Sequence, residues 1–209
     1  MATAINKLFI PKLTASNQAK SVEIAKKLKI DVNWLLGVIF FETARTMSPQ
    51  KTNSIGSVGL IQFTHDPDTP NHKFIAGKQY SLAYIKSLSF DKQMDLVYEY
   101  YKPYAGKMNS FLDVYLVTFF PAALSKSDSY VLQTKSLSRS VIAKQNPIFD
   151  QNKDIQITRG EIKQFFAKWY TPSIFKEIQG TNYLPLILLF FFFLIFKTQQ
   201  NGTNKKFRY

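Results

Sequence analysis

The stretch Trp34–Arg45, which reads WLLGVIFFETAR, decides the fold of this chain. Up to Phe41 every residue in it is apolar except Gly37, and Asp31 stands where a helix of this kind needs an N-terminal cap. A helix that is apolar all round is normally buried at the centre of a domain. The sequence therefore predicts a buried helix that ends at Glu42, with the rest of the chain folded around it.

Other segments predict helices that surround this one. Ser16–Ile30 places Val22, Ala25 and Leu28 on one stripe, as an amphipathic helix does. Similar patterns predict helices at Ser81–Ser87, Asp91–Tyr101, Ser110–Phe120, Ser138–Lys144 and Glu161–Tyr170. Turn-forming residues concentrate in 47–59 and 66–71, which we expect to be loops, and Ile75–Ser81 suits a short hairpin. The expected fold class is mainly α.

The 209-residue chain carries a net charge of +13 and contains no cysteine. The absence of cysteine excludes disulfide frameworks, zinc-thiolate sites and thiol nucleophiles. The positive charge points to a cell wall, a membrane surface or nucleic acid as partner, or to a solvated lysine-rich surface. Nucleic acid is the least favoured partner, because the lysines are spread out and arginine is rare. Residues 1–20 contain no apolar segment typical of secretion signals, so no conventional signal peptide is expected.

The position of Glu42 suits a carboxyl group that stays protonated near neutral pH, as the acid of a glycosidase must. Burial at the end of an apolar helix disfavours the anion, and the negative end of the helix dipole acts in the same direction. An ion pair with Arg45, three residues later, would oppose both effects. The alternative is a solvated glutamate at a helix end, and position alone favours that alternative.

A second motif follows Glu42 and changes the balance. Glu42-Thr43 is followed, 14 residues after the glutamate, by Gly56-x-x-Gly59-Leu60-Ile61-Gln62-Phe63. This pair of motifs resembles the lytic transglycosylases and goose-type lysozymes, most closely their phage-associated branch. In that family the motifs read Glu-Ser and Gly-Leu-Met-Gln or Gly-Leu-Ile-Gln. The resemblance covers Ile24–Leu124 and includes Gln93-x-x-Leu96-Val97-x-x-Tyr100.

The resemblance implies a lysozyme-like α-helical domain over residues 16–145, in a phage-associated or bacterial protein that acts at the cell wall. It implies cleavage of the β-1,4 bond between MurNAc and GlcNAc in the glycan strands of peptidoglycan, with no cofactor required for catalysis. Glu42 would be the general acid. The sugar cleft would be formed by Thr43, Gly59, Leu60, Ile61, Gln62 and Phe63.

Two departures from the family pattern leave a second function open. Thr43 replaces the usual serine and keeps the hydroxyl group. In the segment Asp113–Ala122, however, Thr118–Pro121 stands where the family carries a Tyr-Asn pair, and this removes expected sugar contacts. The alternative is therefore a non-catalytic wall-binding or calcium-binding module on a degenerate lysozyme fold.

Asp66 and Asp68 are the candidates for a second catalytic carboxylate, because they follow the Gln62 motif. An inverting hydrolase would need one of them as a base. A lytic transglycosylase would not, because the family mechanism takes its nucleophiles from the acetamido and 6-hydroxyl groups of the substrate. Both aspartates also suit the capping of turns. We favour the transglycosylase.

Residues 150–161, DQNKDIQITRGE, match the twelve-residue EF-hand pattern at most positions and resemble the loops of calmodulin-like proteins. The calcium ligands would be Asp150, Asn152, Asp154, Gln156 through its carbonyl, Thr158 and Glu161. Ile155 occupies the position at which glycine normally allows a positive φ. The sequence thus predicts an EF-hand-like helix-loop-helix over 146–172, and the alternative is a polar loop that caps the helix near Glu161.

The C-terminal region 181–209 consists of an apolar run, Tyr183–Phe196, and a basic tail. Fourteen residues span about 21 Å as a helix, whereas the hydrocarbon core of a bilayer is about 30 Å thick. A membrane-associated tail is the preferred interpretation. Burial against the domain and a reading shift within the run of phenylalanines are the alternatives.

Overall fold

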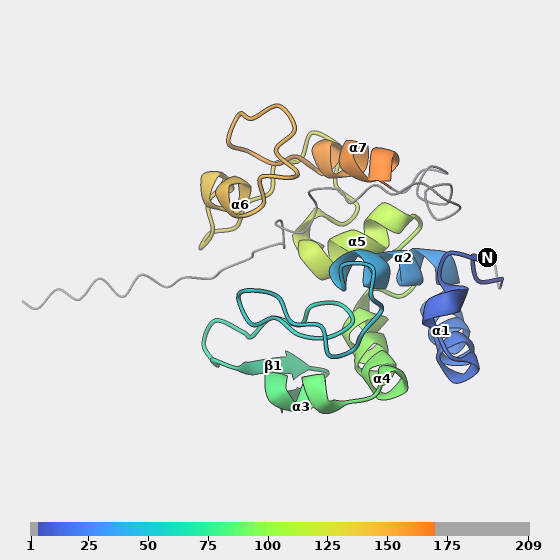
Figure 1. Ribbon diagram of the computed structural model, residues 1–209. Coiled ribbons are helices and arrows are strands. Elements are labelled where there is room, and N and C mark those ends of the chain that lie inside the picture. Colours follow the sequence, from blue (N-terminus) through green and yellow to red (C-terminus); the bar gives the residue numbers. More distant parts are fainter. Residues whose placement is uncertain (1–3, 170–209) are drawn as a thin grey trace, which may run out of the picture.

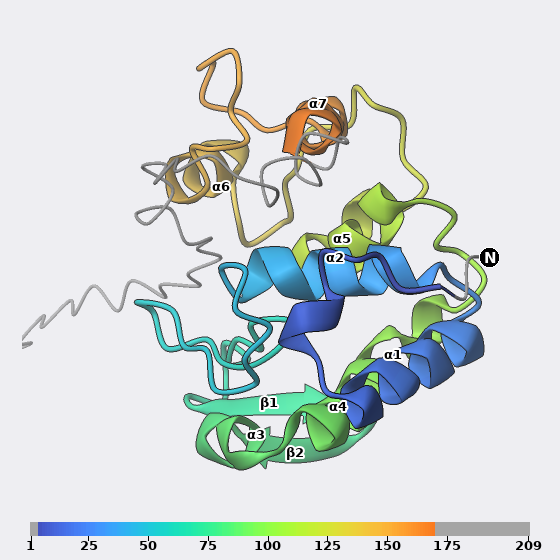
Figure 2. The ribbon, with the colours of Figure 1, turned by 45° about the vertical axis from the view of Figure 1, so that its right-hand side comes forward.

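The computed structural model describes residues 4–169. Its centre is helix α2, Val32–Glu42, which packs against α5, Phe111–Phe119. Helices α1, Ala15–Leu28, and α4, Phe90–Tyr101, pack against each other in a second layer, with the hairpin beyond them (Figures 1 and 2). The remaining α-helices of this part of the chain are α3 (Leu82–Ser87), α6 (Arg139–Gln145) and α7 (Arg159–Trp169). Short 3-10 helices occupy Ile10–Lys12 (η1), Lys102–Tyr104 (η2) and Pro121–Ala123 (η3).

The helices begin where the sequence supplies caps. Thr14 and Asn17 form a reciprocal capping box at the start of α1. The Asp31 carboxylate accepts a hydrogen bond from the Asn33 amide at the start of α2, as predicted. Serine side chains cap α3, α4 and α5 in the same way, and each such cap contributes about 1 kcal/mol. Each predicted helix is present, so the prediction of a mainly α fold is confirmed.

The apolar stretch that opened the sequence forms the core, as predicted. Leu35, Leu36, Val38 and Ile39 are all 0% exposed. Eight of the eleven residues of α2 are buried, which explains why its sequence shows no polar stripe.

The predicted hairpin is also present. Strand β1, His72–Ile75, pairs antiparallel with β2, Lys78–Ser81. The two residues between them, Ala76 and Gly77, have φ of 50° and 78°, so the turn is of the type whose twist matches that of the strands. The hairpin begins at His72, three residues before the predicted start at Ile75.

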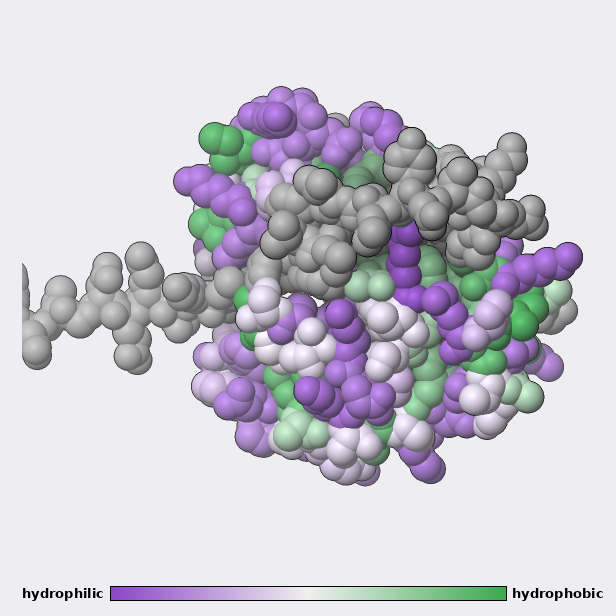
Figure 3. Space-filling view, viewed as in Figure 1, coloured by the Kyte–Doolittle hydropathy of each residue, from purple (hydrophilic) through white to green (hydrophobic). Residues whose placement is uncertain are grey.

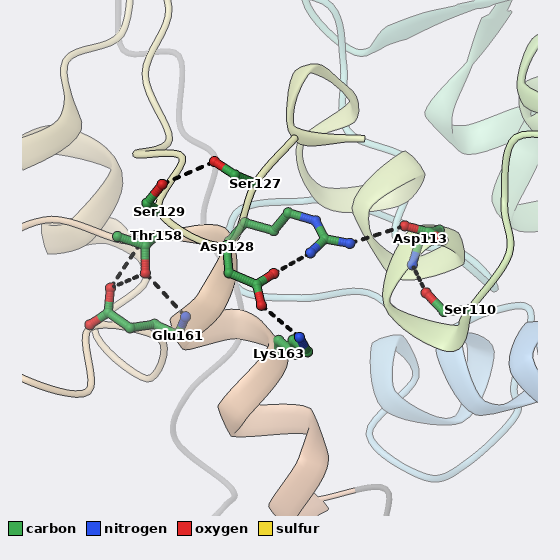
Figure 4. Close-up of polar contacts among 9 residues, drawn as sticks. Ser110, Asp113, Ser127, Asp128, Ser129, Thr158, Glu161 and Lys163 are labelled. Carbon is green, nitrogen blue, oxygen red and sulfur yellow. Dashed lines mark hydrogen bonds and ion pairs between the residues drawn. The ribbon is translucent and has the colours of Figure 1, made fainter. Parts of the chain in front are cut away.

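Helix α7 packs on the core through ion pairs and aromatic contacts. The Arg159 guanidinium bonds to both Asp113 of α5 and Asp128, and Lys163 binds Asp128 at 2.6 Å. Figure 4 shows Asp128 facing Lys163, with Asp113 close by. The ring of Phe166 lies 4.4 Å from that of Tyr115, between ring centroids. Residues 146–169 therefore pack on the helical domain.

The predicted membrane-associated tail, Tyr183–Phe196, lies outside the described residues. Within 4–169, no helix combines the length and the hydropathy needed to cross a bilayer. On the face seen in Figure 3, hydrophilic and hydrophobic residues are interspersed.

Candidate active site

Glu42 is the last residue of the central helix and is only 6% exposed. Burial raises the pKa of its carboxyl group to about 8. Within residues 4–169 this carboxyl group takes part in no hydrogen bond and no ion pair, so nothing offsets the loss of hydration. The solvated glutamate considered from sequence is therefore wrong, and a carboxyl group that stays protonated at neutral pH is what the fold provides.

Arg45 does not pair with Glu42, because the chain reverses at the end of α2. Ala44 and Arg45 have φ of 49° and 69°, and the Arg45 amide donates to the Phe40 carbonyl at 2.7 Å. This arrangement closes the helix in the way that a C-terminal glycine usually does, here with alanine. Non-glycine residues in this region of φ cost of order 1 kcal/mol each, and such strain is often found at functional sites.

Thr43 serves the backbone rather than the cleft. Its hydroxyl donates to the Ile39 carbonyl at 2.7 Å and accepts from the Met47 amide at 2.9 Å. The residue is 0% exposed. We therefore correct the expectation that Thr43 contacts sugar: its hydroxyl holds the turn that follows Glu42.

A cavity of about 260 Å³ lies at the end of the central helices. Three segments that are distant in sequence form its wall. They are 61–67 with Lys73, 118–122 with Tyr100, and Thr134 with Leu137. The structure thus brings the Gln62 motif together with residues 118–121.

The second motif divides between the cavity wall and the layer beneath it. Ile61, Gln62 and Phe63 line the cavity, as expected. Leu60 is 0% exposed, and Gly59 lies against a side chain from α4. Gly59 and Leu60 therefore support the wall without forming it, which corrects the expectation for these two residues.

Gln62 is held in a single orientation by its own loop. Its φ is 51°, and its side-chain Nε2 donates to the carbonyls of Gly59 at 2.9 Å and Lys51 at 3.3 Å. The remaining oxygen, Oε1, is buried and has no hydrogen-bond partner among residues 4–169. Gln62 consequently offers an acceptor, already fixed in place, for a ligand donor.

Gln93, the first residue of the pattern that the sequence analysis quoted from 93 to 100, holds this loop onto α4. Its Oε1 accepts from the Leu60 amide at 3.0 Å. Its Nε2 donates to the carbonyls of Pro49 at 2.6 Å and Ile85 at 2.7 Å. Both N–H groups and the oxygen of this buried side-chain amide are therefore hydrogen-bonded, and Gln93 fixes the position of the Gln62 motif relative to α4.

Three tyrosines interact electrostatically with Glu42, and of these only Tyr100 belongs to the pattern that the sequence analysis singled out. They are Tyr100 and Tyr101 of α4 and Tyr115 of α5. Burial raises the pKa of each, and the Glu42 charge raises it further. Tyr100 lines the cavity, whereas Glu42 itself does not.

The two candidate second carboxylates differ in position. Asp66 lines the cavity, but its Oδ1 accepts from Lys73 and its Oδ2 from the Phe74 amide, both at 2.6 Å. Asp68 is exposed and is not part of the wall. Asp66 thus acts as a turn-stabilising group, as the capping alternative predicted.

The loop 150–161 is folded on its own side chains, which accept hydrogen bonds from its backbone amides. The Asp150 carboxylate accepts from the amides of Asp154 and Ile155, both at 3.1 Å, and the Asn152 Oδ1 accepts from Asp154 at 2.9 Å. Ile155 has a φ of 65°, at the position where the pattern calls for glycine. The β-branched side chain of Ile155 is thus held at a φ that such residues rarely adopt, and the EF-hand-like geometry stays a prediction.

The end of the loop is a helix cap. Thr158 and Glu161 form a reciprocal capping box at the start of α7, with contacts of 2.8 and 3.1 Å. The other Glu161 oxygen accepts from the Gln151 amide at 3.2 Å. Within 4–169 no group of three or more His, Asp or Glu side chains is arranged to hold a metal. The oxygen donors suit a hard cation, but the carboxylates of Asp150, Asp154 and Glu161 already accept hydrogen bonds within the loop, and calcium binding stays a prediction.

The candidate site thus combines the buried carboxyl group of Glu42 with a largely apolar cavity. The cavity wall carries one free acceptor, the Gln62 Oε1, and one ion pair, Asp66 with Lys73. Such a combination suits the protonation of a neutral leaving group. No protein-family model, no curated protein and no solved structure matches this chain.

Proposed function

We propose that this protein is a muramidase, a lytic transglycosylase or lysozyme, with a lysozyme-like helical fold and Glu42 as its general acid. The observation that carries the proposal is the state of Glu42. A carboxyl group with a pKa of about 8, held at the end of the central helix, is protonated at neutral pH and ready to donate. The resemblance of the two motifs to the lytic transglycosylases supports the same assignment.

The reaction needs one proton at one oxygen. Glu42 donates its proton to the glycosidic oxygen of the leaving GlcNAc, and the bond to the MurNAc anomeric carbon breaks. The acetamido oxygen of MurNAc stabilises the positive charge that develops there. In a transglycosylase, the 6-hydroxyl then attacks the anomeric carbon and returns its proton to Glu42, so the enzyme ends in its starting state.

The cavity wall suits an N-acetylated sugar. The Gln62 Oε1 is available to accept a hydrogen bond from an acetamido N–H. Phe63, Tyr100, Phe119 and Phe120 supply apolar surface on which the face of a sugar ring can pack. We propose peptidoglycan glycan strands as the partner, and the charge of +13 favours association with an anionic wall.

A second candidate is a wall-binding module without catalytic activity. One observation favours it: Glu42 is 6% exposed and is not one of the residues that line the cavity. Substrate would then occupy the cavity without reaching the acid. Membrane attachment through Tyr183–Phe196 is compatible with either candidate.

Clearing of purified sacculi separates the two. We expect the full chain to clear a sacculus suspension and Glu42→Gln to lose this activity, because the amide keeps the shape but has no acidic proton. Glu23→Gln, the same change at an exposed glutamate of α1, is the matched control and should clear normally. If wild type sediments with sacculi without clearing them, the binding module is correct; clearing by Glu42→Gln would exclude Glu42 as the acid.

A further inference from the structure

One wall of the cavity is a turn from a segment without regular secondary structure. Residues 124–138 join η3 to α6 and form no helix, and within them Thr134 and Leu137 line the cavity. The Thr134 amide donates to the Leu137 carbonyl at 2.9 Å, and the Leu137 amide donates to the Thr134 Oγ1 at 3.0 Å. These two hydrogen bonds close the turn 134–137, so its two lining residues are held as one unit.

The chain on either side of this turn is bound to the loop 150–161. Two residues before the turn, the Leu132 amide donates to the Ile157 carbonyl at 2.8 Å. Two residues after it, the Arg139 guanidinium donates to the side-chain oxygen of Gln156 at 3.1 Å. Because two residues of extended chain span at most about 7 Å, the position of the turn follows that of its partners in the loop.

The backbone pairing continues to the start of α7. The Arg159 amide donates to the Tyr130 carbonyl at 2.9 Å, and the Gly160 amide donates to the Asp128 carbonyl at 2.8 Å. Figure 4 shows Asp128 beside this end of α7. A Cβ at residue 160 would lie 2.9 Å from the Asp128 carbonyl oxygen, a separation too short for a real Cβ. Glycine at this position therefore permits the close approach, and any side chain there would push Asp128 away.

We propose that the end of the loop 150–161 positions one wall of the sugar cavity, with Gly160 as the positioning residue. Its close approach to Asp128 fixes the paired segment 128–132, and this segment fixes the turn 134–137. This role rests on the proposed function, which assigns the cavity to an N-acetylated sugar. It makes the loop a determinant of substrate affinity whether or not the loop binds calcium.

Gly160→Ala in the full chain tests this coupling with two measurements. The added methyl group should displace Asp128 and, through the paired segment, Leu137, so the methyl NMR resonances of Leu137, assigned with Leu137→Ile, should move. The affinity for tri-N-acetylchitotriose, measured by titration calorimetry, should fall by at least about fivefold. Gly106→Ala is the matched control, because its φ of +78° disfavours alanine while nothing lies within 4 Å of the new methyl group and residue 106 does not line the cavity. It should lower stability and change neither measurement.

Leu137 resonances at their wild-type positions in a folded Gly160→Ala overturn the proposal, and so does an unchanged affinity for the trimer. If wild type does not bind the trimer, the proposed function is at fault, and the Leu137 resonances still decide the coupling. Should Gly160→Ala fail to fold, Gln156→Ala takes its place, because it removes only the exposed hydrogen bond to Arg139. Leu137 resonances that do not move in Gln156→Ala would then overturn the proposal.

Discussion

The backbone of Gly59 lies so close to the side-chain amide of Gln93 that a Cβ at residue 59 would overlap the Gln93 Oε1. The φ of Gly59 is +83°, a value that favours glycine in its own right. The same Oε1 accepts the hydrogen bond of the next amide, that of Leu60. The glycine of the motif is therefore required by a close approach between the loop and α4.

Gly59→Ala should lower the free energy of unfolding by about 2–4 kcal/mol, from unfavourable φ together with displacement of the Gln93 hydrogen bond. Gly56→Ala is the matched control. Its φ is +89°, but nothing lies within 4 Å of the added methyl group, so it should cost about 1 kcal/mol. Urea denaturation of both variants measures the difference. Equal losses would show that Gln93 yields to the methyl group.

The Gly59–Gln93 contact could not be predicted from the sequence, although the helices and the hairpin could. Periodicity, caps and turn residues predicted the helices and the hairpin, because these depend on neighbours in sequence. The role of Gln93 depends on three backbone groups from two other segments, and no local pattern encodes it. Tyr101 and Tyr115 were missed for a similar reason, since an aromatic residue at helical spacing first indicates core.

The candidate site divides in the same way. Glu42 is buried, as one of the two interpretations of its position expected, and Gln62 lines the cavity, whose role as a sugar cleft stays a prediction. It could not foresee that the Thr43 hydroxyl is used by the turn after α2, because that turn requires positive φ at alanine and arginine. A run of unusual φ values at ordinary residues has no sequence signature.

Arg159 should contribute more to stability than its exposed neighbour Lys163. The Arg159 side chain is 15% exposed and its guanidinium binds Asp113 and Asp128, whereas the Lys163 side chain is 58% exposed. Arg159→Met should lower the free energy of unfolding by about 1–3 kcal/mol because Asp113 is left buried without its cation. Lys163→Met should cost less than about 1 kcal/mol. Thermal melts of the two variants check this, and a larger loss for Lys163→Met would contradict it.

Ile155→Gly should stabilise the loop 150–161 even without calcium. The residue is 49% exposed, so little apolar contact is lost, and glycine removes the strain of a β-branched residue at φ 65°. We expect a gain of about 1 kcal/mol. A melt in a calcium chelator measures it, and an unchanged or lower midpoint would argue that the side chain packs usefully.

Calcium is tested on the same variant. If the EF-hand-like pattern binds the ion, titration calorimetry at millimolar calcium should show heat for wild type, stronger binding for Ile155→Gly and none for Asp150→Ala. Glu161→Ala is less informative, because it also removes the capping box of α7. No heat and no calcium-dependent rise in melting temperature for either protein would reduce the loop to a helix cap.

The raised pKa of Glu42 predicts a particular dependence of stability on pH. In the unfolded chain the carboxyl group ionises near 4.5, whereas in the folded protein it holds its proton until about pH 8. Between these values the folded state binds the extra proton, so the stability contributed by this group is complete below 4.5 and is lost as the pH rises through the window. The loss amounts to at most about 5 kcal/mol.

Glu42→Gln removes this linkage. The variant should match wild type near pH 5 and be the more stable of the two at pH 8, with Glu23→Gln showing no such trend. Denaturant midpoints across this range provide the measurement. Parallel curves for Glu42→Gln and wild type would mean that Glu42 ionises at an ordinary pKa, and the case for a buried acid would be lost.

The chemistry of the product follows from the position of Asp66. Both of its oxygens are occupied, by Lys73 and by the Phe74 amide, and no other carboxylate lines the cavity within the described part of the chain. An inverting hydrolase holds a second carboxylate free to activate water. If Glu42 acts without such a partner, the 6-hydroxyl of MurNAc is the nucleophile, and mass spectrometry of digested sacculi should find 1,6-anhydro ends.

Asp66→Asn, checked for intact folding by circular dichroism, should still clear sacculi and give the same ends, because the amide oxygen can still accept from Phe74. Reducing ends in the wild-type digest, or loss of clearing in a folded Asp66→Asn, would instead make Asp66 the base and the protein a lysozyme.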